Sequence, residues 1–303
     1  MMKKSVFILL FLNIVIIAKA QNSNLAKNFV YHNLQEALAS NQKITHLNLR
    51  EQNLFLIPTE LEQLQELKFL NLMQNNIENW NITLFELSEL ETLILRQNAV
   101  KYMPNDIKNL KHLKELDMSV CDISNLPKEI GKLNKLEYLR LSLNNITTLP
   151  DALGNCNNLI GLELDHNQLS YLPSSFSNLK KLEHLILTGN QFYEFDKAWL
   201  GLSSLKELNL DNNELRTFPE EVNQLENLEI LLLNYNELEK IPENIVELKK
   251  LSLLSLANNR LKKLPQNLSK LTNLKTLILT NNSLPETEKK RIKTLLPNCS
   301  IYF

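Results

Sequence analysis

One pattern of 23 residues dominates this chain. Eleven copies follow one another from Ile44 onward without a gap or an insertion. The last copy begins Leu274-Lys275-Thr276-Leu277-Ile278-Leu279-Thr280-Asn281-Asn282-Ser283-Leu284 and shows the form L-x-x-L-x-L-x-x-N-x-L. A fixed period of this length predicts a stacked solenoid, because one repeat can bury its apolar face only against its neighbours.

The leucines of each repeat are spaced as in a β-strand. Leu208 and Leu210 alternate with the polar residues Glu207, Asn209 and Asp211, and most of the other repeats show a similar alternation. Each repeat should therefore contribute a short strand with one buried face, and stacked strands should form a parallel sheet. At about 4.8 Å per strand, eleven strands give a sheet on the order of 50 Å long.

An asparagine column follows the strands. Nine of the eleven repeats carry Asn at the eighth residue after the leading one, and the exceptions are Gln52 and Cys121. A buried Asn offers two donors and an acceptor. We therefore expect it to bond the turn backbone of its own repeat and of the next one, where the strand ladder has ended.

Proline marks the second half of the repeat. Eight of the ten prolines occupy one slot, as in Leu126-Pro127 and Leu149-Pro150, while Asn81 and Asp196 break the pattern. Proline fixes φ and cannot donate a hydrogen bond. The outer side is therefore predicted to be extended or a single helical turn, and not a second sheet.

These residues resemble the leucine-rich repeat family, in its 23-residue class with an outer L-P-x-x-I/L segment. The resemblance covers Ile44 to Leu284, and similar repeats occur in secreted bacterial proteins, plant intracellular Ras-group-related proteins and Ras-binding scaffolds of animal cells. It implies an α/β repeat solenoid, a horseshoe with a concave parallel sheet of about eleven strands, and a binding role. It carries over no catalytic residue.

Both ends of the solenoid need a cover. Residues 30–39 predict an amphipathic helix within an N-terminal cap at 21–43, with Leu34, Ala37 and Leu38 on one face. After the repeats at 44–284, Pro285 suits the first turn of a helix in a C-terminal cap at 285–303. Residues 301–303 then predict a final edge segment.

Residues 1–20 have the form of a signal peptide. Lys3 and Lys4 precede an apolar run from Val6 to Ala18, and Ala18-Lys19-Ala20 matches a cleavage site. We predict cleavage after Ala20 and a secreted or periplasmic protein without stable membrane insertion. The mature chain would hold 30 Lys and Arg against 34 Asp and Glu. That balance argues against nucleic acid as a partner, because phosphate binding needs a basic face.

No motif for chemistry is present. The sequence contains no H-E-x-x-H, C-x-x-C or G-x-S-x-G, and its five glycines form no phosphate loop. Cys121, Cys156 and Cys299 fall at separate stations along the solenoid, so no disulfide is expected. We predict no catalytic residue, no metal site and no cofactor.

Neighbouring repeats should place equivalent residues about 4.8 Å apart. This brings Asp117, Arg140 and Glu163 together in alternating charge order. One interpretation is a solvated ion-pair ladder of little energetic value. The other is the polar centre of a binding face, with Tyr138 as a neighbouring anchor.

Apolar residues also gather on the predicted solvent face of the sheet, where contiguous groups indicate a contact site. Scattered exposed apolar residues would be ordinary. Two clusters are predicted: Phe69, Met73 and Ile94 near the start, and Ile230, Leu232, Tyr235, Leu253 and Ile278 near the end.

The predicted function is recognition without catalysis. The concave sheet would bind a protein, with a glycan as the less favoured ligand, through aromatic and aliphatic anchors and a charged centre. The chain is expected to be a monomer with weak self-association at most. The alternative is a structural or adhesive protein of an envelope or matrix that acts by self-association.

Overall fold

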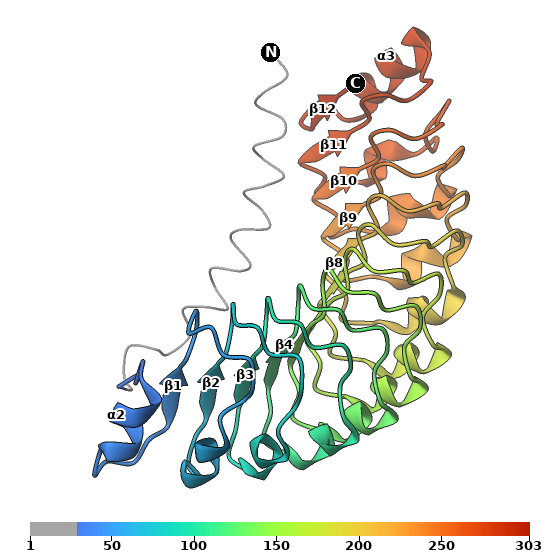
Figure 1. The fold of residues 1–303 in the computed structure, drawn as a ribbon. Coiled ribbons are helices and arrows are strands. Elements are labelled where there is room, and N and C mark those ends of the chain that lie inside the picture. Colours follow the sequence, from blue (N-terminus) through green and yellow to red (C-terminus); the bar gives the residue numbers. More distant parts are fainter. Residues whose placement is uncertain (1–28) are drawn as a thin grey trace.

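The computed structural model describes residues 29–303, so the signal segment expected at residues 1–20 lies outside the described residues. From residue 29 onward the chain makes one flat coil per repeat and stacks the coils into an arc (Figure 1). Strands line the inner side of the arc, and short helices line the outer side. This is the solenoid that the 23-residue period predicts, with an open sheet.

Strands of three residues form one parallel sheet in sequence order. The first eleven are β1 (His46–Asn48), β2 (Phe69–Asn71), β3 (Thr92–Ile94), β4 (Glu115–Asp117), β5 (Tyr138–Arg140), β6 (Gly161–Glu163), β7 (His184–Ile186), β8 (Glu207–Asn209), β9 (Ile230–Leu232), β10 (Leu253–Ser255) and β11 (Thr276–Ile278). The prediction of a parallel sheet of about eleven strands is confirmed, and so is the final edge segment expected near residues 301–303. The sheet has twelve, because β12 (Ser300–Tyr302) in the C-terminal tail pairs with β11.

The register of the sheet follows the sequence period. Each residue of one strand pairs with the residue 23 positions later, as Leu47 does with Leu70. The central leucine of each repeat strand, such as Leu139, points into a core where it has no exposed surface. Flanking residues of each strand point to the inner face of the arc, since side chains alternate along a strand. Equivalent positions are therefore neighbours, as predicted.

The asparagine ladder joins consecutive repeats. Nδ2 of Asn75 donates to the carbonyl oxygens of Leu49 and Leu72, each at 2.9 Å. Its Oδ1 accepts from the backbone N–H groups of Gln52 and Leu54, each at 3.0 Å. The predicted direction was wrong. Each Asn bonds backbone groups of its own and of the preceding repeat, and not of the next one. The backbone groups beside it that lack strand partners belong to the turn after the preceding strand.

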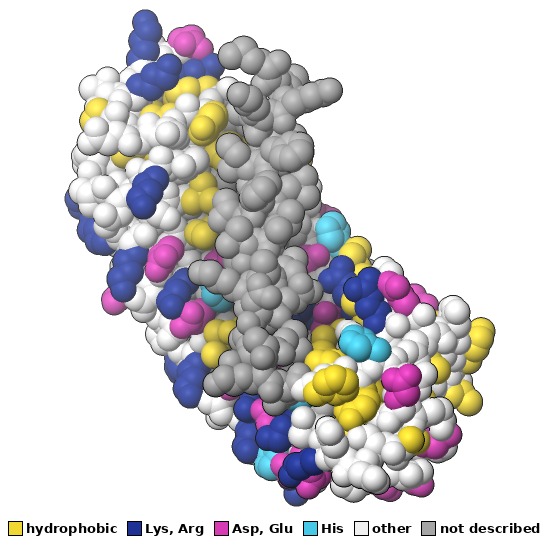
Figure 2. All heavy atoms as spheres, turned by 90° about the vertical axis from the view of Figure 1, so that its left-hand side faces the viewer, with side chains coloured by type: hydrophobic (Ala, Val, Ile, Leu, Met, Phe, Trp, Pro, Cys, Tyr) yellow, Lys and Arg dark blue, Asp and Glu magenta, His cyan; other side chains and the backbone are white. Residues whose placement is uncertain are grey.

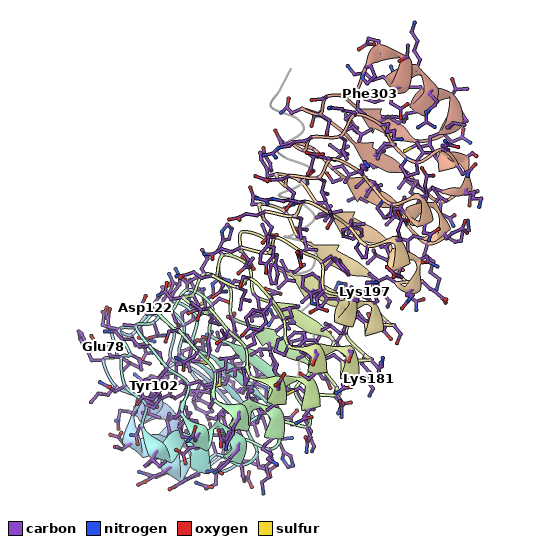
Figure 3. The ribbon with its side chains drawn as sticks, turned by 90° about the vertical axis from the view of Figure 1, so that its right-hand side faces the viewer. Glu78, Tyr102, Asp122, Lys181, Lys197 and Phe303 are labelled. Atoms are coloured by element: carbon purple, nitrogen blue, oxygen red, sulfur yellow. The ribbon has the colours of Figure 1, made fainter. Side chains whose placement is uncertain are left out.

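The outer side consists of 3-10 helices, as the proline slot predicts. They are η2 (Thr59–Gln63), η3 (Ile82–Glu86), η4 (Asn105–Asn109), η5 (Lys128–Lys132), η6 (Asp151–Asn155), η7 (Ser174–Asn178), η8 (Lys197–Gly201), η9 (Glu220–Gln224), η10 (Glu243–Glu247) and η11 (Leu268–Lys270). Proline is the N-cap of seven of these helices. At η3 the cap is Asn81, whose side chain accepts from the Thr83 N–H instead. Lys181 and Lys197 mark this side in Figure 3.

The ends of the solenoid are covered differently from each other. The helix expected over residues 30–39 is shorter: α2 spans Leu34–Ala39 and is capped by the Asn33 side chain. Before it, Tyr31 is extended and bridges Leu47, so it lengthens the sheet instead of joining the helix. At the other end α3 (Glu286–Leu295) follows Pro285, which is its N-cap, and buries Ile292 against the core.

A left-handed turn follows every strand of the repeats. The seventh residue after the leading one has φ between 52° and 67° in all eleven repeats. Gly189 occupies this place once, and Asn occupies it in three repeats. Val120, Leu143 and Tyr235 adopt the same backbone despite their bulk, which is unfavourable for residues with a Cβ.

Candidate functional site

The inner face of the arc is built from three columns of side chains. We call the second, fourth and sixth residues after each leading residue the concave columns. Strand pairing places neighbouring members of a column side by side, as in the pairs Asp117–Arg140 and Arg140–Glu163. Figure 2 shows hydrophobic side chains in a line along the upper part of the molecule, where the C-terminal repeats lie.

Arg140 is the centre of a charge network that spans three strands. Its guanidinium pairs with the carboxylate of Glu115 on β4, and its Nε donates to Glu163 on β6 at 3.2 Å. Burial alone would lower the pKa of Arg140, but the carboxylates of Glu163 and Glu115 raise it. Burial raises the pKa of Glu163 against the opposite effect of Arg140.

The predicted order of charges holds, but the predicted pairing of Asp117 does not. Asp117 lies beside Arg140 in the sheet, yet its Oδ1 accepts from the backbone N–H of Ser119 at 2.9 Å. Glu115 takes the guanidinium instead. The Arg140 side chain is only 13% exposed, so the centre is a partly buried network and not a solvated ladder.

Tyr138 is held against this network from two sides. Its ring lies 5.6 Å from the guanidinium carbon of Arg140, within cation–π range. The next strand has Gly161 at the paired position, and a Cβ there would come within 2.8 Å of the Tyr138 ring. The Tyr138 ring can therefore lie over β6 because Gly161 has no side chain there.

Carboxylates continue beyond Arg140 along the sheet. On β8, Glu207 is buried and contacts Nδ1 of His184 at 3.0 Å. Asp211 is also buried and accepts from the backbone N–H and the Nδ2 of Asn234, at 2.6 and 3.0 Å. Burial raises the pKa of Asp211 to about 6 despite these two bonds.

At the C-terminal end the concave columns become apolar. Ile230 pairs with Leu253, while Leu232 and Ile278 flank Ser255 in the next column. Tyr302 on β12 extends that column beyond Ile278. We call Ile230, Leu232, Leu253, Ile278 and Tyr302 the apolar strip. Tyr235 stands at the left-handed turn beside it and is 57% exposed.

The N-terminal cluster is smaller. Phe69 stacks on His46 with ring centroids 5.7 Å apart. Ile94 pairs in the sheet with Asn71 and not with Phe69. Met73 follows the same strand as Phe69, two side chains further on the same face, with Asn71 between them. All three predicted residues are partly exposed.

Glu115, Gly161, Glu207 and Tyr302 are among the residues of this face that sequence reasoning did not single out. Glu115 and Arg140 lie on a diagonal between columns, so comparison within one column does not pair them. Gly161 has no side chain to attract notice. Tyr302 lies 24 residues after Ile278 and so falls outside the 23-residue period. Glu207 could have been found, because its column places it beside His184.

Other features of residues 29–303 offer little chemistry. No cluster of three or more His, Cys, Asp or Glu side chains in this range is arranged to hold a metal ion. No helix in the same range is long and apolar enough to cross a membrane. A hollow of about 440 Å³ on the outer flank is lined by residues of both charge signs, including Arg216, Glu239 and Lys263.

Comparison with known families gives matches to repeats in the middle of the chain. The Leucine rich repeat family profiles match residues 134–192 and, with a second profile, residues 112–133 and 204–225. A comparison with curated proteins finds no significant match.

Solved structures with the same architecture include bacterial and plant proteins. A leucine-rich repeat protein of Leptospira interrogans is 26% identical with a TM-score of 0.58, and the match covers 91% of this chain and 100% of that one. The Arabidopsis receptor kinase HAESA, solved with the peptide hormone IDA and the co-receptor SERK1, is 30% identical with a TM-score of 0.71. That match covers 83% of this chain and 45% of the receptor chain.

An internalin of Listeria monocytogenes is 23% identical, with a TM-score of 0.63 and coverage of 80% of this chain and 75% of that one. This likeness concerns the fold alone.

Proposed function

Because the chain is a leucine-rich repeat protein, we propose that it recognises a protein ligand through the concave face and catalyses no reaction. The observation that carries the proposal is that one sheet bears the Arg140 network on β4 to β6 and the apolar strip on β9 to β12. Ligand-binding anchors on this surface are Phe69, Met73, Ile94, Asp117, Tyr138, Arg140, Glu163, Ile230, Leu232, Tyr235, Leu253 and Ile278.

The physical basis is a rigid surface. Each strand between β1 and β12 is fixed to both neighbours by the sheet, and the asparagine ladder adds bonds at most of the joints, so concave side chains have little freedom to rearrange. Binding to such a surface does not require ordering of the backbone. Tyr138 and Arg140 are also held by their own contacts, and residues of these two types commonly dominate binding energy.

A second support comes from proteins of the same fold. The plant receptor HAESA was solved with a peptide hormone, and a further plant receptor of 25% identity was solved with the peptide RGF2. A polypeptide ligand for the present chain is consistent with these complexes. A glycan fits less well, because the apolar strip has few groups to bond sugar hydroxyls.

The test is affinity capture from the envelope and secreted fractions of the source cells with the mature chain from Gln21. A concave variant, Tyr138→Ala with Arg140→Ala, is compared with a flank variant, Tyr171→Ser with Tyr193→Ser, both exposed aromatics away from the concave columns. A protein retained by wild type and the flank variant but lost with the folded concave variant supports the proposal. Equal retention by all three contradicts it.

We further propose that the protein works outside the cytoplasm as a secreted or periplasmic protein. The support is the sequence of residues 1–20, where Lys3 and Lys4 precede an apolar run and Ala18-Lys19-Ala20. N-terminal sequencing of protein from the culture medium or periplasm should begin at Gln21. An intact Met1 would contradict cleavage.

Self-association is the second candidate, because Tyr302, the last member of the apolar strip, is exposed on the edge strand of the sheet. Sedimentation velocity over a range of concentrations distinguishes the two. A constant monomer mass favours recognition of another protein. A rising mass that Tyr302→Ser abolishes favours assembly.

A further inference from the structure

The concave columns are divided by charge. In the repeats of β4 to β8 they contain six carboxylates, which we call the anionic centre: Glu115, Asp117, Glu163, Asp165, Glu207 and Asp211. Within the repeats of β4 to β8, Arg140 is the single Lys or Arg of these columns, and Arg96 follows in the adjoining repeat of β3. The fourth-position column alone reads Asp117–Arg140–Glu163, so the excess of carboxylates over cations becomes clear only when all three concave columns are compared.

The repeats of β9 to β12 differ sharply from the centre. Their concave columns contain no acidic or basic side chain, and instead hold the apolar strip with Asn, Ser, Thr and Ala between its members. The boundary is abrupt, since Glu207 of β8 pairs directly with Ile230 of β9.

Building on the proposed function, we propose that the apolar strip docks a polypeptide segment in which apolar side chains are followed by a Lys or Arg that reaches the anionic centre. The occupant follows from complementarity. Apolar side chains of the ligand cover the strip. A Lys or Arg further along the ligand then contacts the carboxylates of the anionic centre. This contact sets the orientation of the ligand and excludes acidic competitors.

The spacing of the two parts sets a length for the segment. Leu253 on β10 and Glu163 on β6 are four strands apart, or about 19 Å. An extended peptide spans about 3.3 Å per residue. The basic residue should therefore lie roughly six residues from the apolar group.

Other ligand classes fit less well. Nucleic acid and an anionic lipid surface would both bring negative charge against the carboxylates, at a cost in free energy. A neutral glycan has no cation for the centre. A second copy of this chain would have to offer its own basic segment, and sedimentation of the concentrated protein would reveal it.

The probe is a display library of random peptides of about 12 residues, long enough for the predicted spacing, selected on the mature chain. Enriched sequences should combine Lys or Arg with Leu, Ile or aromatic residues at the predicted spacing. Binding of a synthetic enriched peptide should fall about fivefold in Glu163→Gln with Asp165→Asn, near the upper limit for a partly exposed ion pair. It should fall similarly in Leu253→Ser with Ile278→Ser.

The matched control is Tyr171→Ser with Tyr193→Ser, which removes exposed aromatic surface from the flank and should leave binding unchanged. Circular dichroism confirms that each variant is folded. Raised salt should weaken peptide binding to wild type, and it should weaken binding to Glu163→Gln with Asp165→Asn less.

Three results would overturn the inference. In the first, the enriched peptides contain no Lys or Arg, but their binding is lost in Tyr138→Ala with Arg140→Ala. This refutes the predicted cation and leaves recognition by the concave face supported. Binding that is equal in the strip, charge and Tyr138 variants refutes both. Absence of enrichment, or a chain that dimerises through the strip, rules out peptide docking there and leaves a folded protein ligand as the remaining form of the proposed function.

Discussion

Tyr138 lies over Gly161, and a Cβ at Gly161 would come within 2.8 Å of its ring carbon Cδ1. Gly161→Ala should therefore move the ring and weaken its contact with Arg140. A double-mutant cycle of Gly161→Ala with Tyr138→Ala, followed by urea unfolding, should give a coupling free energy of about 0.5–1 kcal/mol. Additive effects would show that the ring does not depend on the glycine.

Removal of one ladder asparagine should destabilise the solenoid. Asn167 donates to the carbonyls of Leu141 and Leu164, each at 3.0 Å, and accepts from the N–H of Ile146 at 3.0 Å. Asn167→Ala leaves these buried groups unpaired, at a cost of roughly 1–3 kcal/mol. Exposed Asn145 is the matched control, and Asn145→Ala should change stability by less than about 0.5 kcal/mol. Identical melting curves for wild type and Asn167→Ala would refute this role.

Val120 is the one β-branched residue at the left-handed turn, with φ of 56°. This conformation costs a residue with a Cβ roughly 1–2 kcal/mol, and Asn tolerates it better. Val120→Asn should therefore raise the free energy of unfolding by about 1 kcal/mol. Leu143→Asn at the same φ is the comparison and should gain less, since Leu is not β-branched. A loss of stability in Val120→Asn would mean that the valine side chain contributes more by packing than its backbone costs.

Asp211 should make stability depend on pH. Burial raises its pKa to about 6, above the ordinary 3.8, so the folded chain holds this proton more tightly than the unfolded chain. Its contribution to stability therefore grows as pH falls through 6, is complete below about 4, and is lost as pH rises again. Relative to Asp211→Asn, wild type should gain up to roughly 3 kcal/mol between pH 7 and pH 4. Parallel curves from urea unfolding at several pH values would exclude this titration.

The cysteines should differ in reactivity. Burial raises the pKa of Cys121 to about 11 and that of Cys156 to about 12, so almost no thiolate forms at either site near neutral pH. Burial also raises the pKa of Cys299, but this residue is partly exposed. Iodoacetamide should modify Cys299 slowly in the folded protein and all three residues in denaturant, as read by mass spectrometry. Modification of Cys156 in the folded chain would contradict its burial.

The repeat architecture was predictable because one constraint recurs. The 23-residue offset that aligns Leu47 with Leu70 in the sequence is also the pairing offset in the sheet. The proline slot likewise predicts the short outer helices, since Pro127 fixes the backbone at the N-cap of η5. Regular stacking also placed Asp117, Arg140 and Glu163 side by side, as expected.

Departures arise where the period gives no information. Tyr31 could join either the helix or the sheet, and it pairs with the free edge of β1 instead of entering the helix. The pairing of Ser300 with Thr276 depends on α3, which returns the chain to the sheet after 24 residues. Arg140 pairs with Glu115 because its side chain reaches diagonally across the strands. Comparison of equivalent positions in the sequence does not include that reach.

The uniform joint between repeats has a consequence for how such a chain can change over generations. Because every ladder asparagine meets the preceding coil in the same way, a duplicated or deleted unit of 23 residues leaves equivalent joints on either side. The anionic centre and the apolar strip occupy different units. Inherited changes can therefore lengthen, shorten or retune one half of the surface while the other half keeps its ligand contacts.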